Sequence, residues 1–199
     1  KYINGSKATV VATPADCYDF GGWYEGETLV SEEAEYTFTV TEDVDLVAKF
    51  TLKTFEVTVT ADPEEGGEVD GDGTYDCGSK VTVEATPADC YDFGGWYEGE
   101  TLVSEEAEYT FTVTEDVDLV AKFTLKTFEV TVTADPEEGG EVDGDGTYDC
   151  GSKVTVEATP ADCYDFGGWY EGETLVSEEA EYTFTVTEDV DLVAKFTLK

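Results

Sequence analysis

Five cysteines are the residues whose type and spacing point most directly to chemistry. Their positions are Cys17, Cys77, Cys90, Cys150 and Cys163. Cysteines spread through a chain of small cores favour disulfide bonds in an oxidising compartment, so we expect an extracellular or cell-surface location. Zinc is the weaker interpretation, because no two cysteines are separated by two residues and the sequence contains no His.

Residue types that serve in catalysis are scarce. The sequence has no His, which is the commonest general base, and no Arg, which clamps phosphate and carboxylate groups. Glu105 with Glu106, or Asp116 with Asp118, have the chemistry of a glycosidase pair. Among 48 acidic residues such pairs arise by chance, so we expect no enzyme, no catalytic residue and no cofactor.

An acidic loop gives the one candidate metal site. From Asp70 onward, oxygen ligands recur at every second residue, as in the first half of an EF-hand calcium loop. The candidate calcium ligands are Asp70, Asp72 and Asp76, with Asp143, Asp145 and Asp149 in the next copy. The twelfth position is Val81 and not a bidentate Glu, and a Gly-Asp-Gly turn needs no ion, so we favour a turn over calcium.

Two further patterns have both a binding and a structural interpretation. Trp96 with Tyr91 and Phe93 has the composition of a sugar-stacking platform, but we favour an aromatic core. Asn4 opens an Asn-Gly-Ser acceptor sequence and is therefore a candidate N-glycosylation site.

The elements that must position these residues belong to a repeat. Residues 54–126 recur unchanged as residues 127–199, and residues 1–53 form a third, shortened copy without a counterpart of residues 54–73. A chain built from copies of one unit is usually an array. We therefore expect three repeat domains with these boundaries.

Two disulfide pairings are open. Pairing within a repeat joins Cys77 to Cys90 and Cys150 to Cys163. Residues 80–86, however, alternate like one straight strand, which at about 3.3 Å per residue separates its ends by roughly 20 Å. The Cα atoms of a disulfide lie within about 7 Å of each other, so both flanks of this strand would have to fold back.

Pairing between neighbouring repeats places one cysteine at each end of a repeat. The bonds would then be Cys17 to Cys77 and Cys90 to Cys150. This pairing explains why Asn4 replaces the backward-facing cysteine of the first repeat, and it leaves Cys163 unpaired or bonded to another chain. We favour it on geometric grounds.

Charge and composition exclude several partners. Ten Lys against 48 acidic residues give a net charge of -38, whereas nucleic acid requires clustered Lys and Arg. A hydrophobic fraction of 40% and an aromatic fraction of 13% are too high for a disordered chain. No apolar run approaches the roughly 18 residues of a membrane span, so we expect none.

Apolar residues alternate with polar ones at the two-residue period of a strand. The pattern runs through residues 55–61, 81–85, 109–113 and 117–125. We predict an all-β tandem array of small β-rich repeat domains with five or six strands each. No Gly, Pro or polar spacer interrupts residues 125–128, so we expect consecutive repeats to form a rigid rod.

Aromatic, glycine and apolar landmarks recur at fixed positions of the repeat. In the second copy they include Gly66, Gly67, Val69, Gly71, Gly73, Tyr75, Gly78, Pro87, Tyr91, Phe93, Gly95, Trp96, Tyr97, Tyr109, Phe111, Leu119, Ala121 and Phe123. The pattern resembles the divergent internalin B-repeat family of surface proteins. That resemblance implies tandem β-rich modules that act as stalks or adhesive spacers without catalysis. Cys90 departs from it, because the family typically has Gly there.

These features predict a non-catalytic extracellular structural protein, a rigid disulfide-stapled segment of a cell-surface stalk or of an extracellular filament or sheath. The alternative is a multivalent adhesive module that binds carbohydrate, a host protein or calcium. The expected partners are the chain itself, head to tail or laterally, or other cell-surface components. Without a counterpart of residues 54–73, the first repeat should expose a sheet edge that a neighbouring subunit completes.

Overall fold

The computed structural model describes residues 3–199. The contacts within the chain define two compact units, of which one contains the whole first repeat and the other the whole third repeat. Each unit also holds part of the second repeat. Their bounds are Lys1–Thr60, Val69–Ala85 and Trp96–Val120 for one unit, and Ala61–Glu68, Thr86–Gly95 and Ala121–Lys199 for the other.

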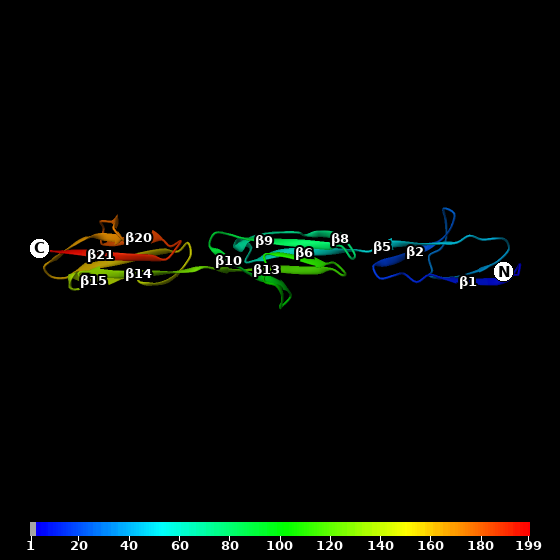
Figure 1. The fold of residues 1–199 in the computed structure, drawn as a ribbon, viewed down its shortest axis with the longest axis horizontal. Coiled ribbons are helices and arrows are strands. Elements are labelled where there is room, and N and C mark those ends of the chain that lie inside the picture. Colours follow the sequence, from blue (N-terminus) through cyan, green and yellow to red (C-terminus); the bar gives the residue numbers. More distant parts are fainter. Residues whose placement is uncertain (1–2) are drawn as a thin grey trace. The chain divides into compact units, whose positions relative to one another are not determined.

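The third repeat shows the complete fold (Figure 1). It has eight strands, and a short 3-10 helix, Glu137–Gly139, follows the first of them. The strands are β14 (Thr127–Asp135), β15 (Gly140–Asp143), β16 (Gly146–Asp149), β17 (Lys153–Pro160), β18 (Tyr164–Glu171), β19 (Thr174–Ser177), β20 (Glu181–Thr185) and β21 (Val190–Leu198). The prediction of an all-β repeat fold is confirmed.

The number of strands differs from the five or six expected for each repeat. The additional strands are β15, β16 and β19, each four residues long. Four residues give only two positions on the buried face, and Gly and Asp at the ends of β15 and β16 have the composition of turns. These segments become strands because they pair with longer neighbouring strands. Their own sequences are too short to show a clear alternation of apolar and polar residues.

Two sheets build the repeat. The larger has the order β16-β14-β21-β18-β19 and the smaller has the order β15-β17-β20. Strands β14 and β21 pair in parallel, from Val130 opposite Val190 to Asp135 opposite Lys195. All other neighbours pair antiparallel. The opening strand β14 is therefore an interior strand, with a partner on each side.

Strands of both sheets contribute to one hydrophobic core. Its buried members are Val130, Val154, Val156, Ala158, Trp169, Val186, Leu192, Ala194 and Phe196. Trp169 is fully buried, and its Nε1 donates a hydrogen bond to Ala180 O at 3.2 Å. Along β17, buried residues alternate with exposed ones, as the sequence pattern predicts for a strand with one face in the core.

Two adjacent glycines allow the chain to pass over a core phenylalanine. A Cβ atom on Gly139 would lie 2.5 Å from Phe196 Cβ, and one on Gly140 would lie 2.6 Å from Phe196 Cζ. These separations are far below carbon–carbon contact distance, so the glycine pair is required by close approach.

The second repeat has the sequence of the third, and its strands have the corresponding bounds. They are β6 (Thr54–Asp62), β7 (Gly67–Asp70), β8 (Gly73–Asp76), β9 (Lys80–Pro87), β10 (Tyr91–Glu98), β11 (Thr101–Ser104), β12 (Glu108–Thr112) and β13 (Val117–Leu125), with a 3-10 helix at Glu64–Gly66.

The first repeat is smaller. Its strands are β1 (Lys7–Val11), β2 (Tyr18–Glu25), β3 (Thr28–Ser31), β4 (Glu35–Thr39) and β5 (Val47–Leu52). Strand β1 pairs with β4, and the other three form a sheet of order β3-β2-β5. These five strands are the counterparts of β9 to β13 of the second repeat.

Candidate functional site at the repeat junctions

Each junction between consecutive repeats carries one disulfide. Cys17 is bonded to Cys77, and Cys90 is bonded to Cys150. The Cα atoms are 5.4 Å apart in the first pair and 5.5 Å apart in the second. Both bonds join neighbouring repeats, and neither lies within a single repeat.

A single lysine separates the last strand of one repeat from the first strand of the next. Lys53 lies between β5 and β6, and Lys126 lies between β13 and β14. Lys126 N donates to Cys90 O at 2.8 Å, and Cys150 N donates to Lys126 O at 2.9 Å. Lys53 makes the same two bonds with the cysteines of the first junction. The residue at each junction is therefore held by both of its main-chain polar groups beside a disulfide.

The side chains of these lysines stabilise the junctions less than their main-chain groups do. Lys126 Nζ lies 3.5 Å from Asp92 Oδ1, and Lys53 Nζ lies 3.5 Å from Asp19 Oδ1. Both aspartates are largely exposed. Exposed ion pairs of this kind stabilise a protein by about 1 kcal/mol at most, so the disulfide and the main-chain bonds dominate.

Cys163 is exposed and is the free cysteine of the described residues. Its carbonyl oxygen accepts a hydrogen bond from Lys199 N at 2.8 Å, as the carbonyl oxygens of Cys17 and Cys90 do from the junction lysines. The main chain at Cys163 therefore has the hydrogen bond of a junction without the disulfide.

The aspartates considered as a carboxylate pair hold the opening strand of the second repeat. Asp116 Oδ1 accepts a hydrogen bond from Glu56 N at 2.8 Å, and Asp118 accepts one from the hydroxyl of Thr58. Asp189 makes the equivalent bond to β14 in the third repeat. Sequence reasoning missed this role, although Asp116, just before β13, and Asp118, within it, are two residues apart, a spacing that puts both side chains on the same side of an extended chain.

The acidic loop after β7 forms hydrogen bonds of its own. Asp70 Oδ1 accepts from Gly71 N at 2.8 Å, and Tyr75 Oη donates to Gly71 O at 3.0 Å. Across residues 3–199, His, Cys, Asp and Glu side chains nowhere gather in threes at a spacing suited to a metal ion. The candidate calcium ligands Asp70, Asp72, Asp76, Asp143, Asp145 and Asp149 are thus not brought together as such a group.

The remaining candidate residues occupy contrasting environments. Trp96 is fully buried, and its Nε1 donates to Ala107 O at 3.1 Å. Phe93 packs edge-on against Phe123, with ring centroids 5.8 Å apart. These aromatic side chains serve the core, since a buried indole presents no face on which a sugar stacks. Asn4 lies in an exposed turn.

The fold and the junctions define a class of protein, a tandem array of small all-β repeats. The chain belongs to the divergent InlB B-repeat domain family, whose model matches residues 1–54, 57–127 and 130–199. The resemblance inferred from the aromatic and glycine landmarks is confirmed, and the family is one of repeat domains.

Two relatives come from Evansella cellulosilytica. One, named "Putative membrane protein", is 28% identical over 183 residues, which cover 91% of this chain and 27% of the relative. The other, named "Putative Gly-rich membrane protein", is 29% identical over 181 residues, which cover 89% of this chain and 20% of the relative. The chain thus spans under a third of either relative. Within residues 3–199, no helix has the length and apolar character needed to cross a membrane.

Among solved structures, the Bacillus anthracis TIE protein is similar over 84% of this chain and 39% of its own chain. The TM-score is 0.37 and the sequence identity is 10%.

Proposed function

We propose that this chain is a non-catalytic structural segment of a cell-surface stalk or of an extracellular filament or sheath, in which it acts as a stiff spacer. The observation that carries the proposal is how the main chain is held at each repeat junction. A strand ends, one lysine follows, and the next strand begins. Two main-chain hydrogen bonds hold that lysine, and a disulfide joins the two cysteines beside it. Few backbone torsions at the junction remain free to rotate, so consecutive repeats have little freedom to reorient.

The chemistry of the chain supports an extracellular setting. Disulfides persist in oxidising compartments and are rare in the cytosol. The 48 acidic residues against ten Lys make neighbouring repeats repel each other, which favours an extended arrangement over a collapsed one.

Absence of the usual catalytic residue types supports a role without chemistry. The sequence has neither His nor Arg, and Asp116 and Asp118 are used to hold a strand. Self-association and contacts with other surface components are the partners that we propose for such a spacer.

A series of chains with increasing numbers of the 73-residue unit (residues 54–126) tests the proposal. We expect the contour length, measured by electron microscopy, to rise by a constant increment for each unit added. Binding to carbohydrate, host protein or calcium whose affinity rises steeply with repeat number, without a constant length increment, would favour the multivalent adhesive module instead.

A further inference from the structure

The third repeat contains a pocket of about 190 Å³ between its two sheets. Its lining includes residues of β19, the edge strand of the larger sheet, and of β20, the edge strand of the smaller sheet. Sites that enclose a whole small-molecule ligand measure about 300–1,000 Å³. This pocket is smaller, so it has the size to receive a single side chain.

Apolar and aromatic side chains line most of the pocket. They are Val176, Tyr182, Phe184, Val190 and Leu192. The rings of Tyr182 and Phe184 are stacked, with centroids 5.3 Å apart. Both rings are only half-buried, although they lie opposite buried valines of β17. The pocket thus leaves apolar surface accessible beside a closed core.

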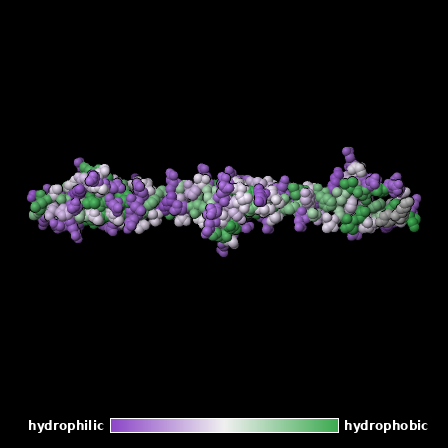
Figure 2. Space-filling view, in the orientation of Figure 1, coloured by the Kyte–Doolittle hydropathy of each residue, from purple (hydrophilic) through white to green (hydrophobic). Residues whose placement is uncertain are grey.

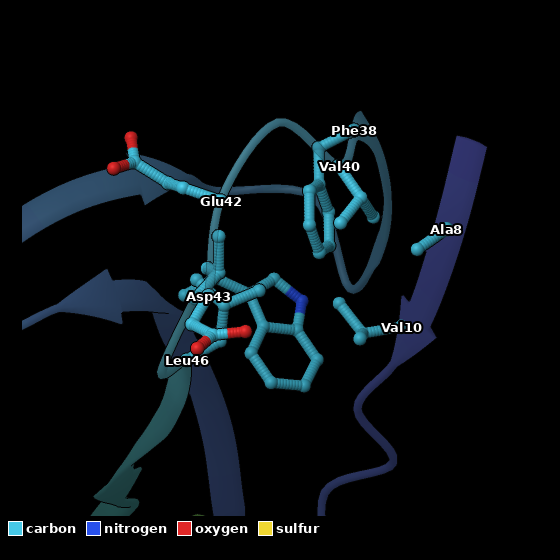
Figure 3. Close-up of a pocket in the computed structure, with 9 residues that line it drawn as sticks. Ala8, Val10, Phe38, Val40, Glu42, Asp43 and Leu46 are labelled. Carbon is cyan, nitrogen blue, oxygen red and sulfur yellow. The ribbon is translucent and has the colours of Figure 1, made fainter. Parts of the chain in front are cut away.

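Two carboxylates belong to the opening of the pocket. Glu171 ends β18, and Glu188 lies in the loop between β20 and β21. Both glutamates are exposed, and the residues that line this pocket include no lysine. In the first repeat, Figure 3 shows Phe38 pointing into the open space and Glu42, the counterpart of Glu188, turned away from it. Exposed side chains change rotamer within nanoseconds, so such a glutamate can turn toward a bound cation.

The residues of the pocket recur in every repeat. Each lining residue of the third repeat has an identical counterpart in both other repeats. The stacked aromatic pair recurs as well, because Tyr36 with Phe38 and Tyr109 with Phe111 have ring centroids 5.4 Å apart. The residues that form the site are thus part of the repeat unit itself.

The charge of the chain favours a cationic guest. Ten Lys against 48 acidic residues leave a net charge of -38. On the face of the third repeat shown in Figure 2, hydrophobic residues (green) lie among hydrophilic ones (purple). A lysine side chain combines an aliphatic stem with a charged end, which matches an apolar pocket that has carboxylates at its opening. Aromatic rings beside an ammonium group add a favourable interaction.

We propose that the pocket binds a lysine side chain of a basic partner polypeptide. The stem lies against Phe184 and Leu192, and the ammonium group lies between Glu171 and Glu188. One such contact is weak, but the chain carries these residues in each of its repeats, so a partner with several lysines gains affinity through multivalency. The proposal does not rest on the spacer function, because a chain of any stiffness can carry the pocket.

Titration of the full chain with Nα-acetyl-lysine N-methylamide, followed by NMR of the methyl groups, tests the proposal at a physiological salt concentration of about 150 mM. We expect saturable shifts of the Val176 and Leu192 methyl signals. The norleucine analogue keeps a stem without the charge and should bind about three- to tenfold more weakly, because it loses two ion pairs. The diaminopropionic acid analogue keeps the charge on a short stem and should leave these methyl signals unshifted.

Substitutions at the opening of the pocket separate a local contact from the effect of net charge. Glu171→Gln and Glu188→Gln, each made at the equivalent position of every repeat, should lower the affinity for the lysine probe about two- to fivefold. Glu173→Gln, made likewise, is the matched control, because Glu173 is exposed and does not line the pocket. It removes the same charge and should bind like the parent chain.

Three results would overturn the proposal. One is the absence of saturable methyl shifts with the lysine probe. Another is an equal loss of affinity in the Glu171→Gln and Glu173→Gln chains, which would mean that the amine only screens the net charge. The third is tighter binding of glucosamine than of the lysine probe, which would make an amino sugar, and not a polypeptide, the partner.

Discussion

At the scale of single residues, the fold of the repeat depends on two kinds of position. At one kind a large side chain is fully buried, and at the other there is no space for any side chain. Trp169 is fully buried with its indole nitrogen satisfied, whereas Gly140 has no room for a Cβ. The sequence indicates that a tryptophan belongs to the core, because an aromatic cluster in an alternating pattern is typical of one. It does not show that the glycine pair lies over Phe196, because this contact joins segments far apart in the chain.

We predict that Gly140→Ala destabilises the third repeat by about 1–3 kcal/mol, the usual effect of overpacking a tight core. The φ angle of Gly140 is extended, so steric contact with Phe196 and Thr159 O, and not backbone strain, is the cause. Denaturant unfolding measures the effect. Glu141→Ala alters the adjacent exposed residue and should change the free energy of unfolding little. Equal effects of the two substitutions would show that the close approach is unimportant.

Cys163 leads to a second prediction at this scale. It is exposed, unbonded and positioned like the cysteines that bridge the junctions. Under mild oxidation we expect chains linked by a disulfide through Cys163, seen as a band of doubled mass on a non-reducing gel. Cys163→Ser should remove this band and leave the two junction disulfides intact. Persistence of linked chains in this variant would mean that a junction cysteine is exchanging.

At the scale of elements, the long strands can be predicted from the sequence, whereas the strands with which they pair cannot. Alternation predicts the segments that became β14, β17 and β21, since each buries one face. The parallel pairing of β14 with β21 joins the two ends of the repeat, and nothing local records that contact. The disulfide partners are easier to infer, because a straight strand keeps Cys77 and Cys90 of one repeat far apart.

We predict that removing the second disulfide with Cys90→Ser and Cys150→Ser loosens the junction without unfolding the repeats. The core of the third repeat contains no cysteine. For a sequence separation of 60 residues, the chain-entropy model gives a loss of about 4 kcal/mol. Amide exchange should accelerate at the main-chain N–H of residue 150, which in the parent chain donates to Lys126 O, while amides in β17 keep their protection. Loss of protection throughout the third repeat would show that the disulfide holds the fold itself.

At the scale of the whole molecule, charge is the dominant property. A net charge of -38 at pH 7 is spread over three repeats that share few cations. Like charges raise the free energy of any compact state, and salt screens them over about 8 Å at physiological ionic strength. This charge repulsion can be predicted from the sequence alone, because net charge depends on composition and not on contacts.

We predict that the melting temperature rises when NaCl is increased from about 10 mM to about 500 mM, over which the Debye length falls several-fold. Differential scanning calorimetry measures this, and a non-ionic osmolyte of equal osmolarity controls for solvent effects. A melting temperature that falls with added salt would mean that the four surface ion pairs of the described residues outweigh the repulsion.

The stiffness of the repeat junctions is the central claim, and small-angle X-ray scattering of the oxidised chain tests it most directly. We predict a cross-section of a single repeat and a maximum dimension that grows by one repeat length when another copy of residues 54–126 is inserted. Reduction of the disulfides should broaden the distance distribution. A compact particle, or a maximum dimension that grows only as the square root of repeat number as in a flexible chain, would contradict the account.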